Sequence, residues 1–147
     1  MASKSEKKLI DARIKNAELF NRNIKKLMRI IYSKTGKNLS TKANINWLQN
    51  KIKIGVSISV FEIIERCQDK IVGVTDHIKK KNVKFFLDRK YDEYIKQDDN
   101  QKFIVTIIEL IQKGYPHLKE DEKKEIWGIA KQLLICSLKN KISVIKD

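Results

Sequence analysis

The feature that most constrains this chain is a dense apolar run between residues 103 and 111. At 100° per residue its members cover nearly the whole circumference of a helix: Phe103, Ile104, Val105, Ile107, Ile108, Leu110 and Ile111. A helix that is apolar all round must be enclosed by other helices. The run is preceded by cap candidates at Asp98, Asp99 and Asn100, so the pattern predicts the central helix of a bundle rather than a buried strand.

A Gly-Tyr-Pro sequence at residues 114–116 ends this helix, and a second apolar pattern follows it. The apolar positions of the second pattern have helical spacing: Ile126, Ala130, Leu133 and Leu134. Its first turns carry the negative charge that a helix N-terminus favours: Glu120, Asp121, Glu122 and Glu125. We therefore predict a C-terminal helical hairpin, with Trp127 buried between its two helices.

The whole chain of 147 residues has one Pro and five Gly, and its apolar residues fall at helical spacing almost throughout. We predict an all-α fold, a single compact bundle of about six helices that forms one domain. In this bundle residues 1–54 form basic N-terminal helices and residues 56–147 build most of the core. A chain of this size needs no disulfide or metal for stability, so we expect Cys67 and Cys136 to be reduced core residues.

The net charge of +14 is concentrated in the N-terminal third. Residues 1–54 carry 14 Lys and Arg against three acidic residues, whereas residues 55–97 carry nine against seven and residues 98–147 nine against eight. Since 27 of the 32 basic residues are Lys, the codon bias of an AT-rich genome explains part of the total. Uniform bias does not explain the asymmetry, which favours a functional basic surface.

The first helix is predicted over residues 5–33, about 40 Å long, with Ser3 and Glu6 spaced as a capping box. One face is apolar, with Phe20 at its margin: Ile10, Ile14, Ala17, Ile24, Leu27, Met28 and Ile31. The opposite face is basic: Lys8, Lys15, Arg22, Lys26 and Arg29. Such a face is either a solvated helix surface or a surface that docks on phosphates, and the sequence leaves both open.

A shorter helix is predicted over residues 40–53, around Trp47. We interpret Trp47 as a core anchor in preference to a base-stacking platform. Four lysines surround it: Lys37, Lys42, Lys51 and Lys53. If they share a surface with the first helix, the basic patch is continuous.

A third helix is predicted from a second capping-box spacing, Ser59 and Glu62, to residue 78. Its apolar residues have the spacing of a coiled-coil seam: Val60, Ile64, Cys67, Ile71, Val74 and Ile78. We interpret the seam as intramolecular, with a dimer as the alternative, and expect Gly73 to allow a close contact or a bend. A fourth helix with an aromatic side follows: Phe85, Phe86, Leu87, Tyr91, Tyr94 and Ile95. Here too, core packing is preferred over nucleic-acid stacking.

The chain contains none of the motifs that would indicate catalysis, such as a phosphate-binding loop, a nucleophile elbow or zinc-ligand spacing. Four potential zinc ligands stand at intervals of 10, 40 and 19 residues, which match no zinc finger: Cys67, His77, His117 and Cys136. We therefore expect no enzyme activity and no cofactor. The N-terminus lacks a signal peptide and no run spans a bilayer, so we expect a soluble, intracellular protein without a membrane partner.

A set of short motifs in the last 60 or so residues resembles small uncharacterised helical proteins of nucleocytoplasmic large DNA viruses. The motifs are Phe86-Leu87, Asp98-Asp99 before Phe103-Ile104, Tyr115-Pro116-His117-Leu118, Lys124-Glu125-Ile126-Trp127 and Leu133-Leu134. The resemblance implies a setting, an infected-cell cytoplasm or a virion, and it brings no catalytic or binding residues.

The charge distribution predicts a non-enzymatic binding protein for a polyanion, with nucleic acid read by backbone charge as the leading partner. The alternative is a helical adaptor or assembly protein that acts through protein contacts, including a weak homodimer through the first helix. The predicted polyanion site consists of Lys8, Lys15, Arg22, Lys26, Arg29, Lys37, Lys42, Lys51 and Lys53.

Overall fold

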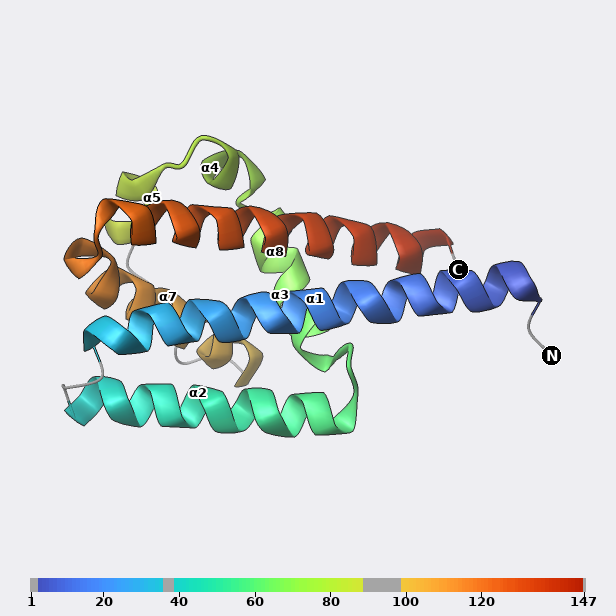
Figure 1. Cartoon of the computed structure of the whole chain (residues 1–147), viewed down its shortest axis with the longest axis horizontal. Helices are drawn as coiled ribbons and strands as arrows, with labels where there is room; N and C mark the ends of the chain where they lie inside the picture. The colour runs from blue at the N-terminus through green and yellow to red at the C-terminus, as the bar shows by residue number, and fades with distance from the viewer. Residues whose placement is uncertain (1–2, 36–38, 89–98, 147) are drawn as a thin grey trace.

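A computed structural model describes residues 3–35, 39–88 and 99–146, and every regular element in these ranges is a helix. In chain order they are α1 (Lys4–Thr35), α2 (Leu39–Ile58), α3 (Glu62–Val72), α4 (Thr75–Lys79), α5 (Val83–Asp88), α7 (Asp99–Gly114), the 3-10 helix η1 (Tyr115–His117) and α8 (Glu120–Lys146). They pack as a compact bundle (Figure 1). The predicted all-α bundle with a long N-terminal helix is confirmed, and this helix packs against the C-terminal helix.

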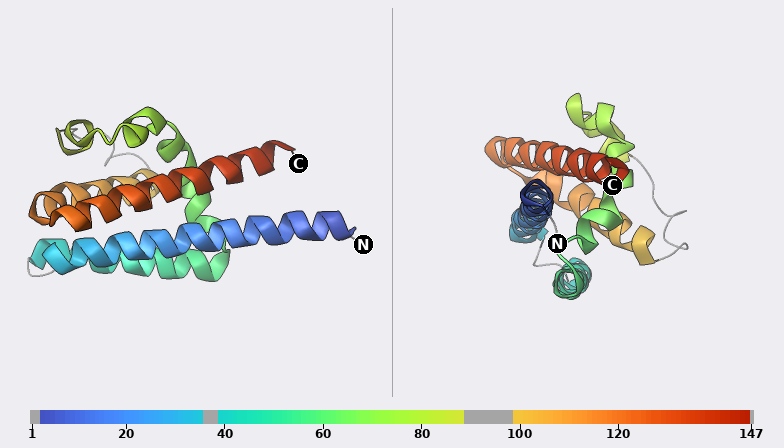
Figure 2. Two further views of the ribbon diagram at one scale, coloured as in Figure 1. Left: turned by 45° about the horizontal axis from the view of Figure 1, so that its top comes forward. Right: turned by 90° about the vertical axis from the view of Figure 1, so that its right-hand side faces the viewer.

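The two longest helices, α1 and α8, lie side by side and antiparallel, and they form the most extensive helix contact in the described ranges (Figure 1). Asn16 ties them together, because its Nδ2 donates to the carbonyl oxygen of Cys136 at 2.9 Å. Helix α2 runs along the other side of α1 (Figure 2). Although α7 and α8 are joined through η1, α8 packs chiefly on α1 and α3. The bundle is thus organised around α1 and α8 rather than around the α7–α8 hairpin.

The start of α1 has the capping box that its sequence predicts. The Ser3 hydroxyl accepts from the backbone N–H of Glu6 at 3.2 Å, and the Glu6 carboxylate accepts from the backbone N–H of Ser3 at 3.3 Å. Helix α8 begins with a related arrangement, in which the backbone N–H of Lys119 donates to Glu122 Oε1 at 3.0 Å. Both helix starts therefore satisfy a backbone donor with a side chain three residues later.

The helix predicted over residues 59–78 is interrupted at Gly73, where a bend was one of the two expected features, and its predicted capping box is absent. The chain leaves α3 at Gly73 and re-enters a helix at Thr75, whose hydroxyl donates to the carbonyl of Val72. Glycine has a low helix propensity, so interrupting the helix at this residue costs less free energy than at its neighbours. The capping box at Ser59 does not form, because the Ser59 hydroxyl accepts from the N–H of Phe61, which is itself the N-cap residue.

The core draws on both halves of the chain. Helices α1 and α2 contribute fully buried Phe20, Ile31, Ile45 and Leu48. The rest of the chain contributes Ile63, Ile64, Cys67, Phe103, Leu110 and Cys136. Phe20, placed at the margin of the apolar face by the sequence, lies at its centre. The two cysteines are free and buried, as expected.

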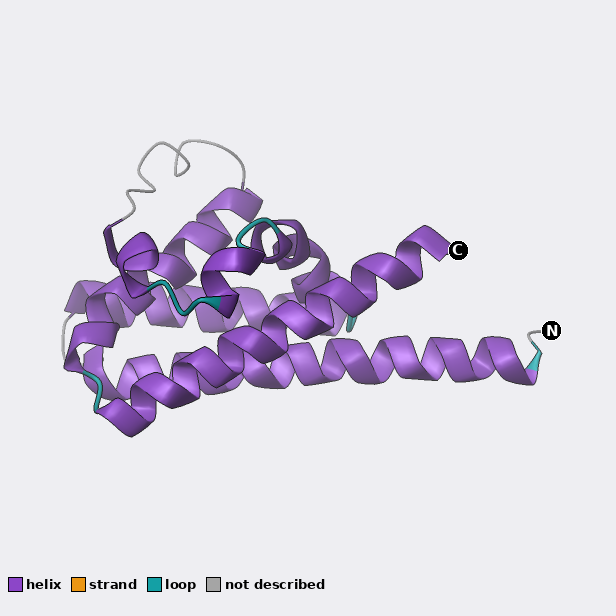
Figure 3. Cartoon of the chain, turned by 90° about the horizontal axis from the view of Figure 1, so that it is seen from above, coloured by secondary structure: helices purple, strands orange, loops and turns teal. Residues whose placement is uncertain are grey.

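The first turns of α1 extend beyond the other helices (Figure 3). Residues 3–12 are all exposed, and within them Leu9 and Ile10 keep 66% and 48% of their surface in solvent. The apolar face of α1 is therefore covered only from about Ala17 onward. Within the ranges given above, no helix combines the length and apolar character needed to cross a bilayer.

Candidate polyanion-binding surface

The exposed face of α1 carries five of the predicted site residues. Lys8, Lys15, Arg22, Lys26 and Arg29 are all exposed and follow one another at steps of three, four or seven residues. Such steps keep side chains on one side of a helix. That side lies opposite the buried stripe that contains Phe20, Ile24 and Leu27. The helix therefore presents a row of cations about 30 Å long at 1.5 Å per residue.

The five cations of this row outnumber the two exposed acidic residues on the same side of α1, Asp11 and Glu18. The ion pairs in the described ranges use other basic residues: Lys34, Arg66, Lys123 and Lys141. None of the five cations of α1 takes part in an ion pair among the described residues. Their charge is therefore directed to solvent, where it attracts anions.

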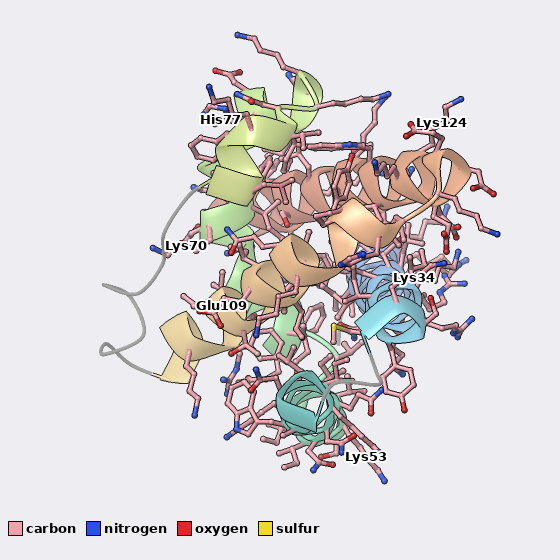
Figure 4. All side chains as sticks on the ribbon, turned by 90° about the vertical axis from the view of Figure 1, so that its left-hand side faces the viewer. Lys34, Lys53, Lys70, His77, Glu109 and Lys124 are labelled. Atoms are coloured by element: carbon pink, nitrogen blue, oxygen red, sulfur yellow. The ribbon has the colours of Figure 1, made fainter. Side chains whose placement is uncertain are left out.

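A shallow groove between α1 and α2 extends this surface. Its lining includes Lys25, Arg29 and Tyr32 from α1 and Gln49 from α2. Lys53 stands four residues after Gln49 and Lys42 seven residues before it, so helical periodicity places both on the groove side of α2. Figure 4 shows Lys53 on α2 pointing outward from the bundle. The structure thus brings Lys42 and Lys53 to the same side as the α1 row.

Lys25 also belongs to this surface, although it is not among the residues predicted from the sequence. It lies at the edge of the basic stripe, four residues before Arg29, and this spacing places it on the same side of the helix. The groove that makes it relevant depends on how α2 packs against α1, which no local pattern reveals.

Lys51 lies apart from the other predicted site residues. It stands two residues before Lys53, about 200° away around the helix, and is half-buried. Its Nζ is 5.7 Å from the centre of the Trp47 ring, and Lys102 Nζ from α7 is 4.8 Å from the same ring. Both distances fit cation–π contacts. Lys51 therefore belongs to the α2–α7 side of the molecule, while Lys37 lies outside the described residues.

Trp47 is half-buried and packs against the core, in keeping with its interpretation as an anchor. The aromatic residues of α5 make similar structural contacts. The Phe85 ring stacks on His77 at 3.6 Å between centroids, and His77 Nδ1 is 3.1 Å from the Asn82 amide nitrogen. His77 is thus held as part of an aromatic cluster. Tyr91, Tyr94 and Ile95 of the predicted fourth helix lie outside the described residues.

The buried thiols are chemically passive. Burial raises the pKa of Cys67 to about 12, and burial also raises the pKa of Cys136. Both thiols are therefore protonated at neutral pH, and a protonated thiol is a poor nucleophile. Among the described residues, no group of three or more His, Cys, Asp or Glu side chains is placed to hold a metal ion.

Among the carboxylates of the described residues, the one with a shifted pKa lies where α8 meets α1. The backbone N–H of Lys119 and the ammonium of Lys34, 3.3 Å away, lower the pKa of Glu122. The pair links the last turn of α1 to the first turn of α8. Its role is to join two helix ends, and it contributes nothing to the basic row.

Comparisons with protein-family models, with curated proteins and with solved structures find no match to this chain.

Proposed function

We propose that this protein is a non-enzymatic nucleic-acid-binding protein that contacts phosphates through the exposed face of α1 and the adjoining side of α2. The observation that carries the proposal is the row of five exposed cations on α1, none of which is paired with an acid among the described residues. Lys42, Lys53 and Lys25 widen the row into a surface.

The geometry of the row suits backbone recognition. A straight helix holds its cations on a line, and a nucleic-acid backbone presents phosphates at regular intervals along its length. Three of the five cations are lysines, which act as point charges without the planar fork that reads bases. Binding should therefore depend strongly on salt and little on base sequence. The resemblance to proteins of large DNA viruses supports an infected cell as the setting.

Fluorescence anisotropy with labelled duplex DNA, single-stranded DNA and RNA tests the proposal over a series of salt concentrations. The variant Lys15→Gln/Arg22→Gln/Lys26→Gln removes three charges from the α1 row. If all three contact duplex phosphates, the slope of log K against log salt becomes shallower by about 2.7, since each contact contributes about 0.9. All three residues are exposed, so the fold should not change.

The matched control is Lys79→Gln/Lys80→Gln/Lys84→Gln, which removes three exposed lysines near α4 and α5. It lowers the net charge equally but leaves the α1 row intact, and we expect its slope to stay near that of the wild type. Equal losses in both variants would show attraction by net charge alone and reject the α1 surface. Absence of binding to every nucleic acid at low salt would reject the function.

A second candidate is an assembly protein, and one observation favours it. Leu9 and Ile10 are exposed on the extended first turns of α1. Uncovered large aliphatic side chains next to each other are common at protein interfaces. The sequence also predicts a weak homodimer through α1, and the two functions are compatible because the basic row lies on the opposite face.

A further inference from the structure

An apolar cavity of about 220 Å³, partly open to the surface, lies between α1, α3, α4, α5, α7 and α8. Its described lining is almost entirely aliphatic or aromatic and includes Ile71, Ile78, Leu87, Ile104, Ile108 and Ala130. Figure 4 shows the side of the molecule where α3, marked by Lys70, faces α7, marked by Glu109. Apolar wall atoms that face an unfilled pocket lack packing contacts, and a small apolar molecule that enters the pocket supplies them.

Besides the exposed Lys70 and the buried Cys67 thiol, the described wall contains one polar pair. Trp127 Nε1–H donates to the hydroxyl oxygen of Tyr115 at 2.9 Å, and both side chains line the cavity. Tyr115 is only 8% exposed. Its oxygen accepts from Trp127, and no described residue accepts its own O–H proton. A tyrosine hydroxyl can donate as well as accept, so this group is the donor that the described wall offers to an occupant with an acceptor.

We propose that the cavity binds a small, mostly apolar molecule with one carbonyl-type acceptor, which takes the hydrogen bond from Tyr115. The size follows from comparison with an engineered cavity of about 150 Å³ that binds benzene, which scales to roughly nine non-hydrogen atoms here. Lys70 is the one charged residue in the described lining and is exposed to solvent, and the apolar remainder of the wall cannot replace the water around a charged group. This inference is independent of the proposed nucleic-acid binding, since the α1 row lies on another face.

Acetophenone and isopropylbenzene are matched probes for this site. Each has nine non-hydrogen atoms, and the second replaces the carbonyl oxygen with a methyl group. The measurement is the 1H–15N NMR spectrum, in which the two indole N–H signals report separately. Trp127 lines the cavity and Trp47 does not. We expect both probes to shift the Trp127 signal in a saturable way and to leave that of Trp47 in place.

The variant Tyr115→Phe removes the hydroxyl and keeps the ring, and because it also removes the acceptor of Trp127 Nε1–H, the two probes are compared within the same variant. We expect it to weaken acetophenone binding about fivefold, the effect of one ordinary hydrogen bond, and to leave isopropylbenzene binding unchanged. Equal effects on both probes would overturn the role of the Tyr115 hydroxyl. No saturable Trp127 shift with either probe in the wild type would overturn the site, and would mean that the protein itself fills the space.

A second variant, Ala130→Leu, places a larger side chain in the cavity wall on α8, where leucine is also a good helix former. It should abolish the shifts caused by both probes while the circular dichroism spectrum stays that of the wild type. Persistence of the shifts in this folded variant would overturn the location. If Ala130→Leu fails to fold, Ile104→Phe on the facing helix α7 reduces the same space and is judged by the same shifts.

Discussion

The two halves of α1 have the same sequence pattern but different surroundings. In the second half, Phe20, Ile24 and Ile31 are almost completely buried against the other helices. In the first half, Leu9 and Ile10 are largely exposed, and every residue from 3 to 12 is exposed. Both halves carry apolar residues on one side and cations on the other. The sequence pattern therefore shows which side of α1 is apolar. How much of that side is buried depends on how far the neighbouring helices extend along α1.

The difference has an energetic consequence. A helix of three turns without tertiary contacts is marginal in water, because its hydrogen bonds barely offset the entropy of ordering the backbone. The first turns of α1 therefore depend on their capping box and on continuity with the packed half. The second half of α1 is stabilised by its buried side chains. The first half should therefore unfold locally, whereas the second half should unfold only together with the whole protein.

Hydrogen exchange should show the largest difference between the halves. Backbone amides of residues 24–31 lie in the packed half, and we expect them to exchange only through global unfolding. Amides of residues 8–12 should exchange through local fraying, several orders of magnitude faster. The rates can be measured by mass spectrometry of peptides from each half. Similar protection in both halves at low protein concentration would show that the first turns are stabilised within the monomer.

The next largest difference between the halves should be in the free energy of unfolding, when an isoleucine in each half is changed to alanine. Ile31 is 0% exposed and Ile10 is 48% exposed, so the same substitution compares burial directly. We expect Ile31→Ala to lower the free energy of unfolding by about 2–5 kcal/mol, and Ile10→Ala to change it by no more than about 0.5 kcal/mol. Urea unfolding followed by circular dichroism measures both. Equal losses would place Ile10 in a covered interface.

Local patterns of the sequence account for much of this fold. The capping box of Ser3 and Glu6, the apolar stripe of α1 and the stop at Gly114 are all local features, and the structure has each of them. The apolar spacing from Val60 to Ile78 continues through Gly73 and by itself predicts one helix, whereas Gly73 indicated the place of the bend. Which helices are neighbours, α1 and α8 above all, depends on long-range packing that no local pattern encodes.

The candidate surface could be predicted only in part, for a similar reason. Exposure of Lys8, Lys15 and Arg22 follows from their position opposite an apolar stripe. The separation of Lys51 from Lys53 follows from helical geometry, once the inner side of α2 is known. The contact of Lys51 and Lys102 with the Trp47 ring joins residues of different helices. Trp127 was expected to be buried, but it is half-buried at a cavity wall that only the tertiary structure creates.

A measurement of self-association tests whether the exposed first half of α1 forms an interface with a second copy of the protein. We expect a mostly monomeric protein whose mean mass rises modestly with concentration, since Leu9 and Ile10 gain cover in a dimer. Light scattering over a concentration series measures this, and Ile10→Asp should abolish the rise. The control is Ile58→Asp, which changes a residue of α2 that is 68% exposed. A stable dimer that survives Ile10→Asp would move the interface to another surface, including the seam of Ile64 and Ile71.

The smallest expected difference is in the pH dependence of stability, and it involves the carboxylates at the starts of α1 and α8. Glu122 accepts from the backbone N–H of Lys119 and pairs with Lys34 of the packed half of α1, and these contacts hold its pKa below the usual value. A depressed pKa in the folded state means that Glu122 stabilises the fold above the pKa of an unfolded glutamate, about 4.3, and that this contribution is lost as the pH falls through the folded pKa.

The pH dependence of Tm between pH 7 and pH 3 should therefore be shallower in Glu122→Gln than in the wild type, with the two curves converging at the acid end. Glu6→Gln is the matched control, because Glu6 occupies the equivalent position in the cap of the uncovered half. That half frays without unfolding the rest, so the control should reproduce the wild-type curve. Parallel curves for Glu122→Gln and the wild type would show that the link between Lys34 and α8 does not contribute to global stability.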